Sequence, residues 1–254
     1  MSIPPLRIGS VPYLNSKVLI WGLDRPNASH TLELHPPSVL ARKLNSGEVD
    51  VALLSSVELF RHPEYRFIPG LGVIGQQTMW SIRLLLRKPL SEARRIGLDP
   101  ASETTNMFLR ILLKEHFKLA LELVALPQGA DALKRDDLDG FLKIGDPALA
   151  FNAPGFTSVD LLGEWHKLTG LPFVFALWLA RSGVEIERVE PLLQQARIEG
   201  FQHAEEIARA HHAETQISYE RALEYVTKIV RYDLGLKEMQ GLERFREYWK
   251  HTTR

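Results

Sequence analysis

The amino-acid sequence predicts an α/β protein with two lobes and a helical C-terminal segment. Short apolar runs alternate with amphipathic helical segments from residue 6 onward, as they do in α/β folds. This alternation restarts after residue 90, and a long buried strand over 173–180 then leads the chain into a helical tail. We therefore expect one lobe to comprise residues 1–90 plus 175–254 and the other to comprise residues 91–174.

Composition and charge narrow the class of protein. The chain has 254 residues, 45% of them apolar, which is enough for one large domain or two of about 100–150 residues. Lys and Arg number 31, as do Asp and Glu, so the basic excess of a nucleic-acid-binding protein is missing. The absence of cysteine excludes disulfides, thiolate zinc sites and a Cys nucleophile. No apolar run reaches the length of a membrane span, and no signal peptide is recognisable, so we expect a cytoplasmic protein without nucleic-acid or membrane partners.

Five buried strands are expected in the first lobe, over residues 6–11, 31–35, 49–54, 67–74 and 79–86. Tyr13 and Asn15 follow the first of them, where open α/β sheets bind ligands. Tyr13 offers an aromatic face with a hydroxyl group, and Asn15 offers hydrogen-bond donors and an acceptor. Asn15 and Ser16 could equally cap the next helix. A further helix is expected to begin at Ser38 and to end at Gly47.

Serine residues mark two other strands of this lobe. Ser55 and Ser56 follow the strand over 49–54 and precede a short helical segment. Their hydroxyls and backbone N–H groups could bind a carboxylate, or they could be plain capping residues. Ser81 is a small hydroxyl in an otherwise bulky strand, which suits a ligand-facing position only weakly.

Hydroxyl groups also precede the main helix of the second lobe. A strand over 95–98 leads into a polar segment and then into an amphipathic helix over 107–117. The free N–H groups and the dipole at a helix start favour an anion. Capping explains only one hydroxyl, so the polar segment favours a ligand site. Its candidate residues are Ser102, Thr104, Thr105 and Asn106.

Two later positions complete the candidate set. Strands are expected over 121–126 and 139–144, and Asp146 after the second is either a helix cap or a site carboxylate, with capping the safer interpretation. Thr169 and Gly170 precede Pro172 at the mouth of the strand over 173–180. The backbone there can approach a ligand closely, although a plain turn into a core strand is the simpler interpretation.

The remaining motifs call for no metal and no organic cofactor. The chain contains no G-x-G-x-x-G, no G-x-x-x-x-G-K-[ST] and no G-x-S-x-G. The sequence therefore does not indicate a nucleotide-binding loop or the nucleophile turn of an α/β-hydrolase. His203, His211 and His212 occur without a His-Glu-x-x-His pattern. Helices are expected near 186–210, 218–234 and 239–250, and they could pack on a second subunit to form a homodimer.

Four segments of the chain together resemble the chorismate dehydratase family, the first enzyme of the futalosine route to menaquinone. They are Arg7 to Asn15, Val49 to Glu58, Ile144 to Leu149 and Asp160 to Trp178. The T-G-L-P-F-V-F-A-x-W run in the last segment is the most specific part, and the match covers nearly the whole chain. The resemblance implies a two-lobed fold like type II periplasmic binding proteins, with a ligand cleft between the lobes, put to cytoplasmic enzymatic use.

The resemblance also implies a reaction: a carbon–oxygen lyase that eliminates water from chorismate to give 3-[(1-carboxyvinyl)oxy]benzoate. The family's binding positions fall on Tyr13 to Asn15, Ser55, Ser56, Ser81 and Ser102 to Asn106. Few bases lie in the matched loops, and Glu58 and Glu164 cannot be oriented from the sequence. We therefore expect Asn15 and Ser81 to position the substrate while its own enolpyruvyl carboxylate takes the proton, with Asp146 as the rival base.

Other functions remain open at this point. A carboxylate-binding or sensor protein of the same fold would bind its ligand without turnover. The dihydroxynaphthoate-forming enzyme of the same pathway shares the fold, but its larger substrate and a poorer match to Tyr-Leu-Asn favour it less. A structural or interaction protein is the least supported, because the polar loops gather at strand ends in both lobes.

Overall fold

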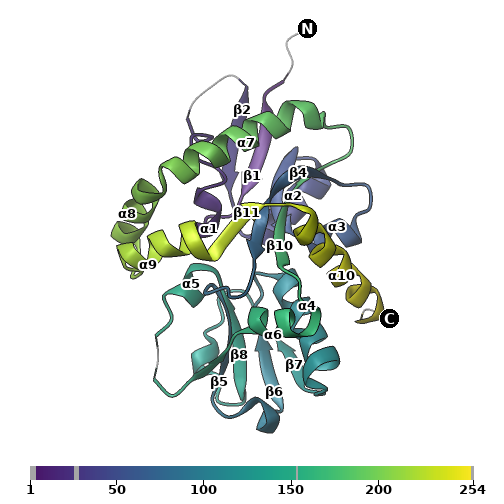
Figure 1. Ribbon diagram of the computed structural model, residues 1–254, viewed down its shortest axis with the longest axis vertical. Helices are drawn as coiled ribbons and strands as arrows, with labels where there is room; N and C mark the ends of the chain where they lie inside the picture. Colours follow the sequence, from purple (N-terminus) through teal and green to yellow (C-terminus); the bar gives the residue numbers. More distant parts are fainter. Residues whose placement is uncertain (1–3, 26–28, 153, 253–254) are drawn as a thin grey trace. The chain divides into compact units, whose positions relative to one another are not determined.

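The computed structural model describes residues 4–25, 29–152 and 154–252. The chain divides into two compact units, each built around one sheet (Figure 1). Unit 1 comprises Met1–Ile74 and Val174–Leu236, and unit 2 comprises Gly75–Phe173 and Lys237–Arg254. Over the described ranges, none of the helices combines the length and the apolar character needed to cross a membrane.

Unit 1 contains a six-stranded sheet in the order β11-β4-β10-β3-β1-β2. Its strands are β1 (Leu6–Ser10), β2 (His30–Leu34), β3 (Val51–Ser55), β4 (Arg66–Gly75), β10 (Phe173–Ala180) and β11 (Val230–Asp233). β1 runs parallel to β2 and β3, whereas β10 runs antiparallel to β3. β3 and β10 lie inside the sheet and are buried along almost their whole length, which explains their continuous apolar sequences.

Helices from both ends of the sequence pack in unit 1 (Figure 1). They are α1 (Leu14–Lys17), α2 (Pro37–Ser46), α3 (Val57–Arg61), α7 (Ile186–Gln202), α8 (Ala204–Glu214) and α9 (Tyr219–Glu224), the last continued by a π-helical turn over Tyr225–Ile229. α7 lies so close to the segment after α1 that a Cβ atom at Gly200 would overlap the carbonyl oxygen of Val18. This contact requires glycine and fixes the later helices against the N-terminal segment of the unit.

Unit 2 contains a five-stranded sheet in the order β7-β6-β8-β5-β9. Its strands are β5 (Ile82–Leu86), β6 (Arg95–Leu98), β7 (Glu122–Ala125), β8 (Gly140–Ile144) and β9 (Thr157–Val159). β6 runs parallel to β7 and β8, and β5 runs antiparallel to β8 and β9. The helices are α4 (Glu103–Ile111), which continues as a π-helical turn over Leu112–Phe117, α5 (Gly145–Leu149), α6 (Leu161–Thr169) and α10 (Leu236–Thr252).

Aromatic packing joins the C-terminal helix to unit 2. The ring centroids of Phe173 and Phe245 lie 4.8 Å apart, and Phe245 is buried. A Cβ atom at Gly241 would overlap the carbonyl oxygen of Pro172, so α10 contacts the backbone of this unit directly. The helix is therefore part of the core of unit 2.

The lobe boundaries expected from the sequence need correction at two places. β5 pairs with β8 and β9, so residues 75–90 belong to unit 2 and not to the first lobe. Residues 237–254 belong to unit 2 as well, because α10 packs there. In both cases the deciding partner is distant along the chain, and the local sequence pattern does not reveal it.

Most of the expected elements are present, but several local predictions are wrong. α2 begins at Pro37 with Pro36 at its N-cap, so Ser38 does not cap it. Ser81 lies in the turn before β5 and not inside a strand. The helix expected over 218–234 ends in the strand β11, and the one expected over 186–210 is divided at His203 into α7 and α8.

Four successive strands of each sheet follow the same plan. In the orders β2-β1-β3-β10 and β7-β6-β8-β5, the three successive pairings are parallel, parallel and antiparallel. An aspartate precedes the third strand in each, Asp50 before β3 and Asp139 before β8. The backbone N–H of Asp50 donates to Arg7 O at 2.8 Å, and that of Asp139 donates to Arg95 O at 2.9 Å.

The Asp50 carboxylate joins neighbouring strands of unit 1 at the edge of the sheet where the parallel strands start, here called the strand-start edge. Its Oδ2 accepts the backbone N–H of Arg7 at 3.0 Å. Its Oδ1 lies 2.7 Å from the Arg7 guanidinium and 2.6 Å from that of Arg181, which follows β10. Although burial acts to raise it, these hydrogen bonds lower the pKa of Asp50 to about 2.

The Asp139 carboxylate plays the same part in unit 2. Its Oδ2 accepts the backbone N–H of Arg95 at 3.0 Å, and its Oδ1 lies 2.7 Å from the Lys88 ammonium group, which follows β5. The hydrogen bond from Lys88 is the main cause that lowers the pKa of Asp139 to about 2. Each sheet therefore carries a cluster of ion pairs at its strand-start edge.

Candidate active site

The opposite edge of the unit 1 sheet gathers the sequence-predicted residues of that unit. β1 and β3 are parallel, with Ile8 opposite Val51, so their carboxyl ends meet at one edge, here called the strand-end edge. β10 is antiparallel, and Ala176 lies opposite Ser55, so β10 starts at this edge. The loop after β1, the Ser55–Ser56 turn and the start of β10 therefore lie along the same edge.

Asn15 and Ser16 have different roles in the loop after β1. The Ser16 hydroxyl is buried and lies 2.5 Å from Val11 O and 2.8 Å from Tyr13 O, so it closes the turn. Tyr13 is the N-cap residue of α1, and no side chain makes a capping bond there, so Asn15 is not the helix cap. The Oδ1 atom of Asn15 is buried without a hydrogen-bond partner among the described residues. Such an acceptor suits a donor on a ligand.

Ser55 and Ser56 also differ. Ser56 is fully buried; its hydroxyl donates to Val174 O at 2.7 Å and its backbone N–H donates to Phe175 O at 3.0 Å. This serine therefore holds the start of β10 against the end of β3. Ser55 is half-buried and ends β3. Its hydroxyl is the better placed of the two to meet a ligand, and a substrate role for either serine stays a prediction.

The strand-end edge of unit 2 gathers three candidate segments. β6 and β8 are parallel, and antiparallel β5 places Ile82 opposite Ile144. The turn before β5, the start of α5 and the loop after β6 therefore share one edge. The buried Ser81 connects two of these segments, because its carbonyl oxygen accepts the N–H of Gly145 at 2.9 Å.

The hydroxyl cluster at the start of α4 is a capped helix terminus. Ser102 is the N-cap residue; its Oγ accepts the N–H of Thr105 at 3.1 Å and lies 2.9 Å from the Thr105 hydroxyl. Thr104, Thr105 and Asn106 are buried. Asn106 Nδ2 donates to Asp99 O at 2.8 Å, while its Oδ1 is buried without a partner among the described residues. Capping thus accounts for Ser102, as expected, and leaves the amide of Asn106 to be explained.

A hollow of about 290 Å³ lies beside this cluster, between α4 and the ends of β6 and β7. Its polar lining comes from Asp99, Glu103, Asn106 and Arg110. Burial raises the pKa of the Asp99 carboxyl, against the hydrogen bonds that it accepts from backbone N–H groups. Sequence reasoning did not single out Asp99, although an aspartate directly after a buried strand was a usable signal.

Asp146 is the second residue of α5, and Ile144 is the N-cap residue of that helix. The interpretation of Asp146 as a helix cap is therefore wrong. The residue is half-buried at the strand-end edge of unit 2, next to the bond between Gly145 and Ser81. Its role as a site carboxylate stays a prediction.

Thr169 and Gly170 form the end of α6. The Thr169 hydroxyl donates to Trp165 O at 2.9 Å and accepts the N–H of Leu171 at 3.2 Å. Gly170 is the C-cap residue with φ 69°, and its N–H donates to His166 O at 2.8 Å. The simpler interpretation of this stretch, a turn into a core strand, is confirmed, and ligand contact here stays a prediction.

The two glutamates that could not be oriented from the sequence are both held by cations. Glu58 lies 2.9 Å from Arg61. Glu164 lies 2.6 Å from His116 and 2.7 Å from Lys167. Burial acts to raise the pKa of Glu164, but hydrogen bonds from Lys167 and His116 lower it. A lowered pKa is the opposite of what a general base needs, which argues against Glu164 in that role.

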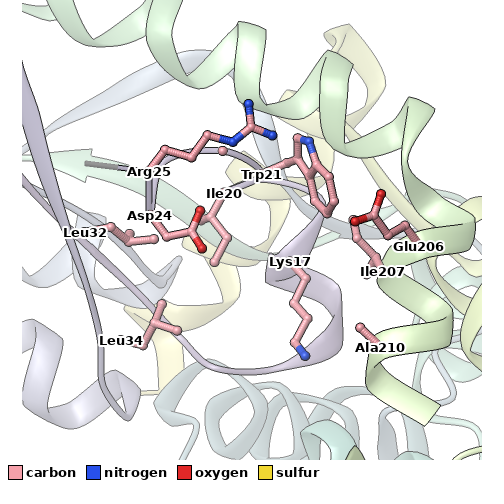
Figure 2. Close-up of a pocket in the computed structure, with 11 residues that line it drawn as sticks. Lys17, Ile20, Trp21, Asp24, Arg25, Leu32, Leu34, Glu206, Ile207 and Ala210 are labelled. Atoms are coloured by element: carbon pink, nitrogen blue, oxygen red, sulfur yellow. The ribbon is translucent and has the colours of Figure 1, made fainter. Parts of the chain in front are cut away.

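Unit 1 carries another hollow, of about 420 Å³, between the edge strand β2, the turn after α1 and helix α8 (Figure 2). Trp21 forms part of its wall and stacks on His203 at a centroid distance of 4.6 Å. Lys17 at its rim is paired with Glu214 at 3.1 Å. None of the sequence-predicted site residues lines it, so we do not place the active site there. Within the described ranges, no group of three or more His, Cys, Asp or Glu side chains could hold a metal ion.

A family model described as menaquinone biosynthesis matches residues 6–251. The chain belongs to this family. Chorismate dehydratase of Thermus thermophilus is 28% identical over 230 residues, which cover 83% of this chain and 83% of that protein. Chorismate dehydratase of Campylobacter jejuni is 30% identical over 141 residues, 55% of this chain and 49% of that protein.

Solved structures show the fold. An Archaeoglobus fulgidus protein has a TM-score of 0.81 at 17% identity, with 98% of each chain covered. The periplasmic aliphatic sulphonate binding protein SsuA of Escherichia coli has a TM-score of 0.67 at 15% identity, covering 99% of this chain and 94% of that chain. The expected α/β fold of the periplasmic-binding-protein type is therefore confirmed.

Proposed function

We propose that this protein is a chorismate dehydratase that converts chorismate to 3-[(1-carboxyvinyl)oxy]benzoate with loss of water. The observation that carries the proposal is the similarity to the Thermus enzyme over 83% of both chains, within a family described by menaquinone biosynthesis. The geometry supports it, because the candidate polar residues gather at the strand-end edge of each sheet, where α/β proteins bind ligands.

The residues of these edges suit a dianionic substrate. The C3 hydrogen of chorismate is acidified through the diene by the ring carboxylate, and its loss as a proton, with departure of the 4-hydroxyl, yields water and an aromatic ring. Such a reaction needs groups that bind carboxylates and stabilise charge that spreads onto them. The capped start of α4 and the hydroxyl of Ser55 offer uncharged donors of this kind.

The group that takes the C3 proton distinguishes two possible mechanisms. Glu58 and Glu164 are engaged in ion pairs, and Asp146 is the candidate carboxylate left from the sequence prediction. We propose that Asn15 and Ser81 position the substrate and that its enolpyruvyl carboxylate takes the C3 proton. The buried, unpartnered Oδ1 of Asn15 supports this positioning role, since it can accept a hydrogen bond from the 4-hydroxyl.

The test is to incubate the purified protein with chorismate, without added metal or cofactor, and to follow products by chromatography and mass spectrometry. A product lighter by one water, with an aromatic absorbance, is expected. If an Asp146→Asn variant bound chorismate but did not turn it over, Asp146 would be the base and the substrate-assisted mechanism would be abandoned. An Asn15→Ala variant with near wild-type turnover would contradict the assignment of Asn15.

A binding protein without turnover is the second candidate. The structural similarity to a sulphonate-binding protein supports it, because that protein binds an anion in the same fold. Chorismate that binds but stays unchanged would favour this reading. If the protein neither binds nor converts chorismate, other substrates should be tested, including that of the dihydroxynaphthoate-forming enzyme.

A further inference from the structure

We propose that Asp99 is a positioning residue that holds the two substrate-binding segments of unit 2, the start of α4 and the start of α5, in fixed register. This inference rests on the proposed function, because it assigns the segments around Ser102 and Asp146 to chorismate. It adds a residue that the sequence motifs do not include.

The hydrogen bonds of Asp99 reach both segments. Its Oδ1 accepts the N–H of Ala101 at 2.9 Å, which shapes the turn before the N-cap of α4. Its Oδ2 accepts the N–H of Ile144 at 3.0 Å, at the residue that precedes α5. Its backbone carbonyl accepts Asn106 Nδ2 at 2.8 Å, from the first turn of α4. One residue thus ties together two segments that are distant in the sequence.

The connection extends to the third candidate segment of this unit. Ile144 is followed by Gly145, whose N–H donates to Ser81 O at 2.9 Å. A continuous path of hydrogen bonds and covalent neighbours therefore runs from the turn before β5, through the start of α5, to Asp99 and the start of α4. A shift at Asp99 would change the separation of the groups that are proposed to contact substrate.

Unit 1 shows that the fold itself does not need a carboxylate at this position. β1 and β6 carry the same Arg-Ile-Gly triplet, and in each the Ile-Gly pair lies opposite the start of the neighbouring parallel strand. Two residues after that glycine, unit 1 has Val11 where unit 2 has Asp99, and a proline follows in both. The Val11 carbonyl accepts the Ser16 hydroxyl, as the Asp99 carbonyl accepts Asn106. The Asp99 side chain is thus an addition to the shared plan.

The electrostatics of Asp99 also point away from a purely structural role. Its carboxylate makes no ion pair within the described part of the chain, whereas Asp50 and Asp139 are paired with cations. The ionisable groups around it are Lys143 on β8 and Glu103 and Arg110 on α4. Burial raises its pKa, so the carboxylate costs stability that a neutral residue would not. Keeping it is reasonable where rigid positioning matters more than stability.

The experiment compares Asp99→Asn with a matched control, Asp139→Asn. Asp139 lies at the other end of the same strand β8 and also accepts backbone N–H groups, so its substitution makes the same chemical change away from the site. Chorismate affinity would be measured by calorimetry, kcat and KM by the product assay, and local stability by hydrogen exchange of segments 100–106 and 144–149. Asp99→Val, which installs the residue that unit 1 uses, is the second variant.

We expect Asp99→Asn to weaken chorismate affinity and to raise KM by about tenfold, with kcat changed only a few-fold, because binding groups move while the reacting groups stay. Hydrogen exchange should accelerate in both segments of this variant. Asp139→Asn should leave affinity and KM within about twofold while lowering the melting temperature.

Each contrary result has a distinct meaning. Unchanged affinity in folded Asp99 variants of an active enzyme overturns the inference alone. A loss confined to kcat, with removal of the acidic limb of the pH profile, overturns it in favour of Asp99 as the base. Failure of both Asp99 variants to fold overturns it in favour of a structural role. A wild-type protein that neither binds nor converts chorismate overturns the proposed function, and the inference falls with it.

Discussion

Asp50 in unit 1 and Asp99 in unit 2 are aspartates beside parallel strands, at opposite edges of sheets that share one plan. Asp50 precedes β3 at a strand-start edge and contacts two guanidinium groups. Asp99 follows β6 at a strand-end edge, and within the described ranges its carboxylate accepts hydrogen bonds from backbone N–H groups alone. The pKa of Asp50 falls to about 2, whereas burial raises that of Asp99.

This contrast separates ion pairs that stabilise the sheets from the polar groups that are candidates for substrate binding. Charges are paired with charges where the parallel strands start. Where the strands end, most of the candidate groups are hydroxyls, amides and helix N–H groups, and two buried amide oxygens, those of Asn15 and Asn106, have no partner among the described residues. A net-neutral chain can thereby present a surface suited to a dianion.

The largest effect is expected from breaking the Asp50 cluster. Asp50→Ala leaves Arg7 and Arg181 without their shared carboxylate and should lower the free energy of unfolding by about 2 to 3 kcal/mol, somewhat less than for fully buried pairs because both arginines are partly exposed. Chemical denaturation would measure this loss. kcat/KM of the folded variant should stay within about twofold of wild type.

Asp137→Ala is the control for this prediction. Its carboxylate lies 2.8 Å from Arg95 and 2.7 Å from Arg135 but is 40% exposed, so solvent screening should keep the loss of stability well below that of Asp50→Ala. A large activity loss in folded Asp50→Ala would contradict the separation of the two edges.

A second large effect should fall on activity and not on stability. Asn15→Ala removes the unpartnered acceptor of the loop after β1 and should lower kcat/KM by about 100-fold, with little change in the free energy of unfolding. The neighbouring Ser16→Ala removes a hydroxyl bonded to Val11 O and Tyr13 O and should cost about 1 kcal/mol of stability instead. Product assays and denaturation of both variants would show whether these two residues divide the roles in this way; equal losses in both would argue against it.

Acid titration should sharpen the contrast further. The carboxyl of aspartate has a pKa of 3.8 in the unfolded chain, whereas that of folded Asp50 is about 2. Ionised Asp50 therefore adds about 2 kcal/mol to the free energy of unfolding above pH 4, and this contribution is lost as the pH falls towards 2. The raised pKa of Asp99 acts with the opposite sign: its contribution is present below the ordinary aspartate range and is lost as the pH rises through the folded pKa. The free energy of unfolding of wild type, Asp50→Asn and Asp99→Asn would be measured across this pH range. The difference between wild type and variant should grow with rising pH for Asp50→Asn and shrink for Asp99→Asn, and a change of the same sign in both would refute the contrast.

The sequence predicted the fold better than the details of the site. β6 and β10 occur where their apolar runs predicted them, because buried strands leave a strong local pattern. β11 was missed because it is short and gains its place through pairing with β4, and β5 was assigned to the wrong unit because its partners β8 and β9 are distant in sequence. Local sequence carries no record of such pairings.

The candidate site divides in a similar way. Asn15 and the Ser102 segment lie at strand ends as expected, since strand-to-helix loops are readable from the pattern. The hydroxyls of Ser56 and Thr169 instead bond backbone carbonyls, a use that the sequence cannot distinguish from ligand binding. Asp99 escaped notice because its significance depends on Ile144, which lies far along the chain.

The smallest expected effect tests whether the cap of α6 is only a cap. A Cβ atom at Gly170 would meet no atom within 4 Å, so Gly170→Ala should cost only the strain of a positive φ, about 1 kcal/mol of stability. kcat/KM should then stay within about twofold of wild type, measured beside Gly47→Ala, a cap with the same φ preference and open surroundings in unit 1. If Gly170→Ala lost about tenfold in kcat/KM while Gly47→Ala did not, the backbone at Gly170 would contact substrate, which is the alternative that the sequence leaves open at the mouth of β10. The strand-end edge of unit 2 would then have to include the end of α6.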